Sequence, residues 1–256
     1  MKKIVYYIFA GIESVLLFII VGAVTTAIAK HIQSTSLIHQ FKQKGVYQES
    51  LSSSNLKVYT IQSNETLETY QIVNGVYYPG NTGDIILSLT SEMEIPFVHG
   101  FVSFFAGGHA ALVLGDYEDQ NTQTNAVNNF KVMEATGLNE TDNYAEIANK
   151  TYWVTADIYQ EVIVVRPKMT EEQRKKVLAN AMAMEKDPYN YSFLFDTKNK
   201  SYCSDLISKT FDTVGINLNK DSFTTSIYDI LISNETYISY YHYYDSQGVK
   251  HVYYLD

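Results

Sequence analysis

The chain has 256 residues, of which 46% are hydrophobic and 14% aromatic, a composition typical of a globular protein with a buried core. Its formal net charge of −9 argues against a nucleic-acid-binding surface, because phosphate contacts require clustered Lys and Arg. The single cysteine, Cys203, excludes an internal disulfide and zinc sites built from several thiolates. We expect no metal site and no cofactor.

The N-terminal residues 4–29 form an apolar stretch in which Glu13 is the only charge. Roughly 20 apolar residues cross the hydrocarbon core as a helix, so residues 1–30 are predicted to contain a transmembrane anchor. Ala27-Ile28-Ala29 resembles a signal-peptide cleavage triplet, which leaves removal of the segment as an alternative. The length favours an uncleaved single-pass anchor. We expect the rest of the chain to be extracytoplasmic at the cell membrane, or secreted if the segment is cleaved.

Residues 31–55 are polar and rich in Gln and Ser, a composition that predicts a juxtamembrane stalk. Residues 56–256 open with short β-type runs such as "LKVYTI", "GDIILSL" and "EVIVVRP". No Pro/Gly-rich linker and no internal repeat divides this part of the chain. We therefore expect one α+β domain over residues 56–256.

Near residue 170 the spacing of the apolar residues changes from the alternation typical of strands to the spacing typical of helices. Thr170 and Gln173 fit a capping box and precede apolar residues at helical spacing. A second helix is predicted from Cys203 to about Val214, and a third at 226–233. The domain should therefore end with helices, followed by a Tyr-rich tail.

Cys203 stands at the start of its predicted helix, in line with the apolar residues Leu206, Ile207, Phe211 and Val214. The positive end of a helix dipole favours a thiolate, and amides at a helix start stabilise an oxyanion. Free cysteines are also among the most buried residue types, so a structural thiol is the alternative.

A thiol nucleophile requires a general base, usually histidine, and a group that orients this base. His109 follows two glycines and begins a β-type run, whereas His99 lies in a predicted loop. Glu134 ends a neighbouring β-type run, where an unpaired buried carboxylate is costly. It is therefore either an orienting group for the base or an edge residue that faces solvent. Three other carboxylates compete for the orienting role: Asp84, Asp116 and Asp205.

Six segments occur in an order that is typical of one enzyme family. They are "GDIILSLT" (83–90), "GHAALVLGD" (108–116), "VMEATG" (132–137), "VIVVRP" (162–167), "DPYNYSFLF" (187–195) and "SYCSDLISKTF" (201–211). In this order they resemble the permuted papain-like amidases, the circularly permuted NlpC-type (YiiX-like) branch of the papain-like cysteine hydrolases. The resemblance covers about residues 80–235.

The resemblance implies a papain-like fold, in which a small antiparallel sheet packs against the helix that bears Cys203. It also implies roles for the site residues, with Cys203 as nucleophile, His109 as base and Glu134 as the orienting group. A hydroxyl of Tyr202 or Tyr189 would be a further donor to the oxyanion or substrate.

The implied activity is cleavage of an amide or ester through an acyl-enzyme, on a peptide, cell-wall or lipid-linked substrate. Two alternatives remain. One is a surface binding module of the same fold without catalysis, and the other is a lipid-acting acyltransferase or phospholipase. Convergence of Cys203, His109 and a carboxylate separates the enzyme from the binding module. Low Arg with abundant Lys, Asn, Ile and Tyr suggests a bacterial source.

Overall fold

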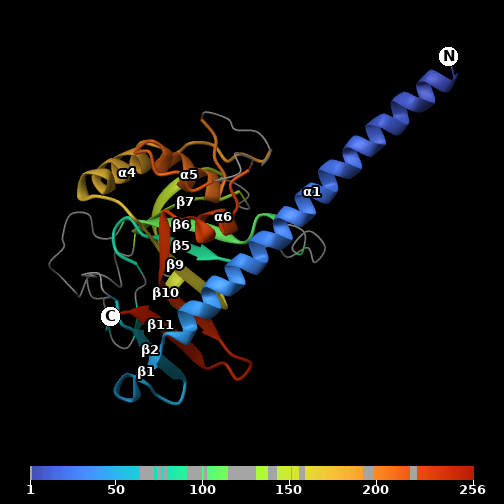
Figure 1. Cartoon of the computed structure of the whole chain (residues 1–256). Coiled ribbons are helices and arrows are strands. Elements are labelled where there is room, and N and C mark those ends of the chain that lie inside the picture. Colours follow the sequence, from blue (N-terminus) through green and yellow to red (C-terminus); the bar gives the residue numbers. More distant parts are fainter. Residues whose placement is uncertain are drawn as a thin grey trace.

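A computed structural model describes residues 2–63, 72–73, 76–77, 80–90, 100, 103–114, 131–137, 143–150, 152–155, 159–192, 199–219 and 224–256. A long N-terminal helix projects from a mixed α+β domain, in which helices pack on a twisted sheet (Figure 1). The fold class predicted from the sequence is confirmed. The sheet and the helices that pack on it position the candidate site.

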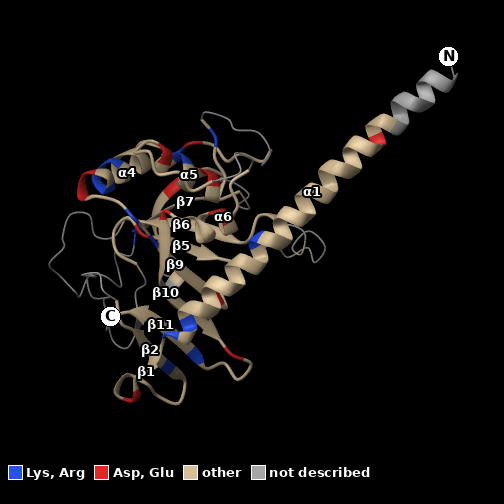
Figure 2. Ribbon diagram, in the orientation of Figure 1, with Lys and Arg blue, Asp and Glu red and all other residues tan. Residues whose placement is uncertain are grey.

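The first helix, α1 (Lys2–Gln43), is continuous and exposes large apolar side chains from Ile12 to Val21. Within the described chain it is the helix long and apolar enough to cross a membrane, judged by length and composition alone. Figure 2 shows the described part of α1 beyond the domain almost free of charge, with basic residues where the helix meets the domain. The apolar N-terminal helix expected from the sequence is therefore present.

Residues 31–55, predicted from composition to be a stalk, are packed against the domain. α1 continues to residue 43, and its side chains at Ser34, Ile38 and Phe41 are buried on one face at helical spacing. After a turn, Val46 and Tyr47 form strand β1, which pairs with the next strand. A narrow buried stripe inside a polar sequence is sufficient to dock the helix.

Nine strands of the described residues form one sheet in the order β1-β2-β11-β10-β9-β5-β6-β7-β8. All neighbours are antiparallel except the parallel pair β2–β11. This sheet is larger than the small antiparallel sheet predicted, because the segment after α1 and the Tyr-rich tail add strands. The strands are β1 (Val46–Tyr47), β2 (Leu56–Ile61), β5 (Ile85–Ser88), β6 (His109–Val113), β7 (Lys131–Ala135), β8 (Ala145–Asn149), β9 (Glu161–Pro167), β10 (Thr236–Tyr244) and β11 (Lys250–Leu255).

Four shorter elements lie outside this arrangement. Strands β3 (Ile72–Val73) and β4 (Val76–Tyr77) form a separate antiparallel pair. A 3-10 turn, η1 (Glu49–Leu51), joins β1 to β2, and a single helical turn, α3 (Tyr152–Thr155), follows β8. Of these, α3 contributes to the candidate site.

Three helices of the C-terminal half form the predicted series: α4 (Glu171–Ala183), α5 (Cys203–Asp212) and α6 (Ile227–Ile232). The capping box of Thr170 and Gln173 forms as predicted, with both reciprocal hydrogen bonds present. Gly215, which follows the predicted end of the second helix at about Val214, has a φ of +78°, a conformation that favours glycine. Sequence signals at the helix ends were therefore reliable here.

The sheet separates two hydrophobic clusters, because alternate residues of each strand point to opposite faces. Leu112 and Met133 lie in the cluster that includes α4, α5 and α6, whereas Ala111 and Val132 lie in the other. The second cluster also contains Trp153 of α3. Side chains near the end of the sheet can therefore contact groups from both layers.

Candidate active site

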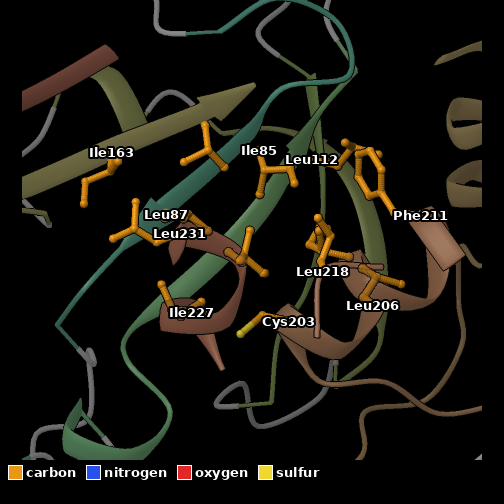
Figure 3. Close-up of a cluster of buried hydrophobic side chains, with 14 of the residues drawn as sticks. Ile85, Leu87, Leu112, Ile163, Cys203, Leu206, Phe211, Leu218, Ile227 and Leu231 are labelled. Atoms are coloured by element: carbon orange, nitrogen blue, oxygen red, sulfur yellow. The ribbon is translucent and has the colours of Figure 1, made fainter. Parts of the chain in front are cut away.

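Cys203 is the first residue of α5, and its free thiol belongs to the hydrophobic cluster on the helix side of the sheet. The helix packs on the sheet through Leu206, Ile207 and Phe211, which are fully buried. Figure 3 shows the Cys203 side chain at the border of this cluster, which also contains Ile227 of α6. The apolar stripe of α5 thus fixes the direction in which the thiol points.

The start of α5 is capped differently from the starts of α4 and α6. Thr170 before α4 and Ser226 before α6 each form a reciprocal capping box. The residue before α5 is Tyr202, whose side chain makes no capping hydrogen bond. The first amide N–H groups of α5, including that of Cys203, are therefore not used by an N-cap side chain and can bind an oxyanion beside the thiol.

His109 is the first residue of β6, and its backbone position depends on the preceding glycine. A Cβ atom on Gly108 would lie 2.1 Å from the carbonyl oxygen of Thr90, a distance no side chain tolerates. The Gly108 amide donates a 3.1 Å hydrogen bond to the Ser88 carbonyl, and Ser88 pairs with His109 in the sheet. The strand and this close approach hold the imidazole in one place.

The structure brings Cys203, His109 and Glu134 together. The His109 ring is hydrogen-bonded to the Cys203 side chain, and its Nε2 atom lies 3.2 Å from Oε2 of Glu134. Because Nε2 of His109 interacts with Glu134, Nδ1 is the ring nitrogen that remains to interact with the Cys203 thiol. The imidazole ring thus lies between a sulfur and a carboxylate, the arrangement of a nucleophile, its base and an orienting group.

Glu134 is fully buried, yet its carboxylate has four polar partners. Besides His109, it accepts hydrogen bonds from the Tyr152 hydroxyl at 2.6 Å and from Trp153 Nε1 at 3.3 Å. The Lys150 ammonium group lies 3.5 Å away. These donors compensate the burial of the charge, which makes Glu134 an interior residue and not a solvent-facing edge residue.

Glu134 and His109 each stabilise the charged form of the other. Burial opposes ionisation of Glu134, but the hydrogen bond and charge of His109, the Tyr152 hydroxyl and the Lys150 charge lower its pKa from 4.5 to about 2. Burial also opposes protonation of His109, yet its hydrogen bonds and charge interactions with Cys203 and Glu134 raise its pKa well above 6.5. The surroundings of His109 and Glu134 thus favour an imidazolium beside a carboxylate.

The three residues come from opposite layers of the protein. Cys203 lies in the helix-side cluster, whereas Trp153, which binds Glu134, lies in the cluster on the other face. His109 is at the end of its strand, and its side chain is 15% exposed. Its ring stacks on Trp153 with centroids 5.6 Å apart and an interplanar angle of 7°. His109 therefore connects the two layers at the end of the sheet.

Tyr202 and Tyr189 both lie near Cys203, but both are held by other contacts. The Tyr202 side chain is buried and hydrogen-bonded to the backbone of Thr225. The Tyr189 ring covers Gly137, where an added Cβ atom would lie 2.5 Å from the ring. Burial raises the pKa of both phenols above 10, and the nearby Cys203 adds to the effect, so both hydroxyls stay protonated as donors.

The competing residues are placed elsewhere or cannot be placed. Asp84 forms a two-point ion pair with Arg166 at 2.9 and 2.8 Å, which is a structural role. Asp205 forms an ion pair with Lys209, one turn further along α5, at 2.7 Å. His99 and Asp116, and the loop at 116–129, lie outside the described residues.

The sequence reasoning missed the residues that surround the carboxylate: Lys150, Tyr152 and Trp153. One signal was available, because Trp153 is the only tryptophan of the chain and lies in the short run "TYW". Nothing in that run indicates that it folds back on Glu134. The contact depends on β8 pairing with β7 and on the helical turn that follows.

Comparison with known proteins gives the family. The model of a family described as permuted papain-like amidase enzyme, YaeF/YiiX, C92 family, matches residues 80–236. The chain belongs to this family. The match spans more than half of the chain and contains Cys203, His109 and Glu134. The family resemblance drawn from the sequence is therefore confirmed.

Three chains of solved structures also match this member of the family. One is the crystal structure of metalloprotein yiiX from Escherichia coli O157:H7, with 18% identity and a TM-score of 0.41. The alignment covers 67% of this chain and 92% of that chain. No curated protein matches. In the described part of this chain, no group of three or more His, Cys, Asp or Glu side chains is arranged to hold a metal ion.

Proposed function

We propose that the protein is a membrane-anchored cysteine hydrolase that cleaves an amide or ester through Cys203, His109 and Glu134. The observation that carries the proposal is the position of the His109 ring, bonded on one side to the Cys203 side chain and on the other to Glu134. Membership of a family of permuted papain-like amidases supports the same reaction class.

The first chemical step forms a thioester between the enzyme and the substrate. His109 holds the proton of the Cys203 thiol, and the thiolate sulfur attacks the substrate carbonyl carbon. When the C–N or C–O bond breaks, the imidazolium gives this proton to the leaving amine or alcohol. Water then attacks the thioester with His109 as base, which releases the acid and restores the thiol. Glu134 holds the ring in place and stabilises its positive charge throughout.

The developing oxyanion would bind the amide N–H groups at the start of α5. Tyr202 provides no side-chain cap there, so the Cys203 amide is a suitable donor next to the attacked carbonyl. The protonated hydroxyl of Tyr189 is near the thiol and is a candidate for a second donor or a substrate contact. The hydroxyl of Tyr202 suits this role less well, because it is bonded to the Thr225 backbone.

We infer that residues 4–29 anchor the enzyme in the cell membrane with the domain on the extracytoplasmic side. The exposed apolar surface of α1 supports an anchor, and no other described helix has the length and composition for one. The substrate would carry an amide or ester within reach of a membrane-tethered domain, on a peptide, a cell-wall component or a lipid-linked group.

The test is the reactivity of the only cysteine in the chain. The alkylation rate of Cys203 by iodoacetamide is measured between about pH 5 and pH 9 in the detergent-solubilised full chain, for the wild type and for His109→Ala. We expect the wild-type rate to rise at a lower pH than that of His109→Ala. Hydrolysis of a generic activated ester should be lost in Cys203→Ser.

Three results would contradict the proposal. Identical alkylation profiles of the wild type and His109→Ala would show that the imidazole does not take the thiol proton. A reactive Cys203 combined with ester hydrolysis that persists in Cys203→Ser would place the chemistry elsewhere. An unreactive thiol in a folded wild-type protein would favour the non-catalytic binding module.

A further inference from the structure

The docked part of α1 contacts the two segments on which the candidate catalytic residues are mounted. Lys30 is the first contact: its ammonium group lies 2.7 Å and 2.8 Å from the two carboxylate oxygens of Asp229. Both side chains are largely buried, with 14% of Lys30 and 4% of Asp229 exposed. A pair with this little solvent exposure is sensitive to loss of either partner.

Asp229 connects Lys30 to the nucleophile segment. Its carboxylate accepts hydrogen bonds from the amide and hydroxyl of Ser226 at 2.9 and 2.6 Å, which closes the capping box of α6. The residue before Ser226 is Thr225, whose carbonyl accepts a 2.8 Å hydrogen bond from Ser204. Ser204 directly follows Cys203. Lys30 is therefore joined to the start of α5 through three hydrogen-bonded contacts: Lys30 with Asp229, Asp229 with Ser226, and Thr225 with Ser204.

His31, the next residue of α1, contacts the segment that leads to the base. Its Nε2 atom lies 2.9 Å from the carbonyl oxygen of Phe104, and its ring packs between Phe104 and Tyr228, with centroids 5.2 and 4.3 Å away. The Tyr228 hydroxyl in turn donates a 2.8 Å hydrogen bond to the carbonyl of Ser103. The chain then runs directly through two glycines to His109.

α6 binds the same two segments to each other. The amide of Ile227 donates a 2.9 Å hydrogen bond to the carbonyl of Ala106. A Cβ atom on Gly107 would lie 2.6 Å from Cβ of Ile227, so the backbone before His109 rests directly on α6. One small helix thus touches the base segment, the nucleophile segment and α1, and the position of α6 affects the distance between the two reacting residues.

We propose that Lys30 and His31 are positioning residues that hold Cys203 and His109 at reacting distance through α6 and residues 103–108. The proposal rests on the function proposed above. Neither residue touches the thiol or the imidazole, and each acts on a segment that carries one of them. The helix is thereby part of the active-site framework as well as an anchor, and the site is competent when α1 is docked.

The experiment compares alkylation profiles of Cys203 in four variants of the full chain. Lys30→Met removes the charge that faces Asp229, and Lys30→Arg restores a charge at the same place. His31→Phe keeps the ring packing and removes the hydrogen bond to Phe104. The matched control is Lys42→Met: this lysine anchors the same helix at its other end, 4.2 Å from the ring centroid of Tyr243.

We expect Lys30→Met and His31→Phe to move the profile toward that of His109→Ala and to slow alkylation at about pH 6 by roughly tenfold, since small misplacements of reacting groups cost this much or more. Lys30→Arg and Lys42→Met should keep the wild-type profile. His31→Phe, which preserves the packing, carries the test if Lys30→Met does not fold.

Three outcomes would overturn the positioning role. Wild-type profiles in folded Lys30→Met and His31→Phe would show that the site does not depend on these contacts. An equal change in Lys42→Met would mean that any loosening of α1 has the same effect. If His109→Ala itself matches the wild type, the proposed function fails and the positioning role fails with it.

Discussion

Replacement of Glu134 by Gln tests the centre of the site with almost no change in side-chain volume. The carboxylate accepts from His109, Tyr152 and Trp153 at 3.2, 2.6 and 3.3 Å. Glutamine has one acceptor oxygen and turns an NH₂ group toward the remaining donors. The substitution therefore leaves at least one buried donor facing another donor, and it removes the negative charge beside the imidazole.

The magnitude follows from the pKa of the carboxyl group. Its fall from 4.5 to about 2 on folding corresponds to roughly 3 kcal/mol of stability at neutral pH, at about 1.4 kcal/mol for each pH unit. Because the folded-state pKa is lowered, this contribution is present above about pH 4.5 and is lost as the pH falls toward 2. We expect Glu134→Gln to lower the free energy of unfolding by about 2–4 kcal/mol at pH 7.

The assay is urea unfolding of the detergent-solubilised chain at neutral and acid pH, together with the cysteine alkylation profile. Glu146→Gln is the matched control, because Glu146 pairs with Glu134 across β7 and β8 and lies 2.7 Å from the same Lys150. Its side chain is 21% exposed, so its loss should cost less than about 1 kcal/mol. It should also leave the alkylation profile unchanged.

Two results would refute this reasoning. Equal destabilisation by Glu134→Gln and Glu146→Gln would show that burial and the four partners do not give Glu134 a special energetic role. An unchanged alkylation profile in Glu134→Gln would show that the carboxylate does not support the charge of His109.

Three further predictions concern the framework of the site. Asp84→Asn should lower stability by about 3–5 kcal/mol because it leaves the largely buried Arg166 without its two-point partner, and the alkylation profile of the folded fraction should not change. Gly108→Ala should destabilise the fold by at least about 1–3 kcal/mol in urea unfolding, because the new methyl group meets the Thr90 carbonyl; wild-type stability would contradict this. Burial lowers the pKa of His242 well below 6.5. As the pH drops from about 6.5, the unfolded chain therefore binds a proton that the folded chain does not, and the free energy of unfolding falls. His242→Phe should remove this part of the acid sensitivity, which is measured as the free energy of unfolding against pH.

Local patterns in the sequence were sufficient to predict the elements that carry the site. The alternation in "HAALV" and "KVMEA", the Thr170 capping box and the apolar stripe after Cys203 each depend on residues close together in the chain. The grouping of Cys203, His109 and Glu134 was reached from the order of family segments and not from the pattern of any one of them.

The remaining features depend on contacts between distant segments. In α1, polar residues such as Gln, Ser and Lys separate the few buried apolar residues, so the composition predicts a stalk. Ile38 and Phe41 pack into the hydrophobic core of the domain, and this contact cannot be predicted from the composition of residues 31–55. The parallel pairing of β2 with β11 joins residues almost 200 positions apart, and no local signal specifies it. The surroundings of Glu134 were likewise out of reach, because α3 reaches this carboxylate only after β8 has paired.

The stacking of His109 on Trp153 gives the protein a spectroscopic property. The chain has one tryptophan, Trp153, and 22 tyrosines. The Trp153 ring lies nearly parallel to the His109 imidazole, with the ring centroids 5.6 Å apart. A protonated imidazole quenches indole fluorescence, whereas the neutral ring does so weakly. Selective excitation of the indole should therefore report the charge of His109 directly in the unmodified chain, without a label on the thiol.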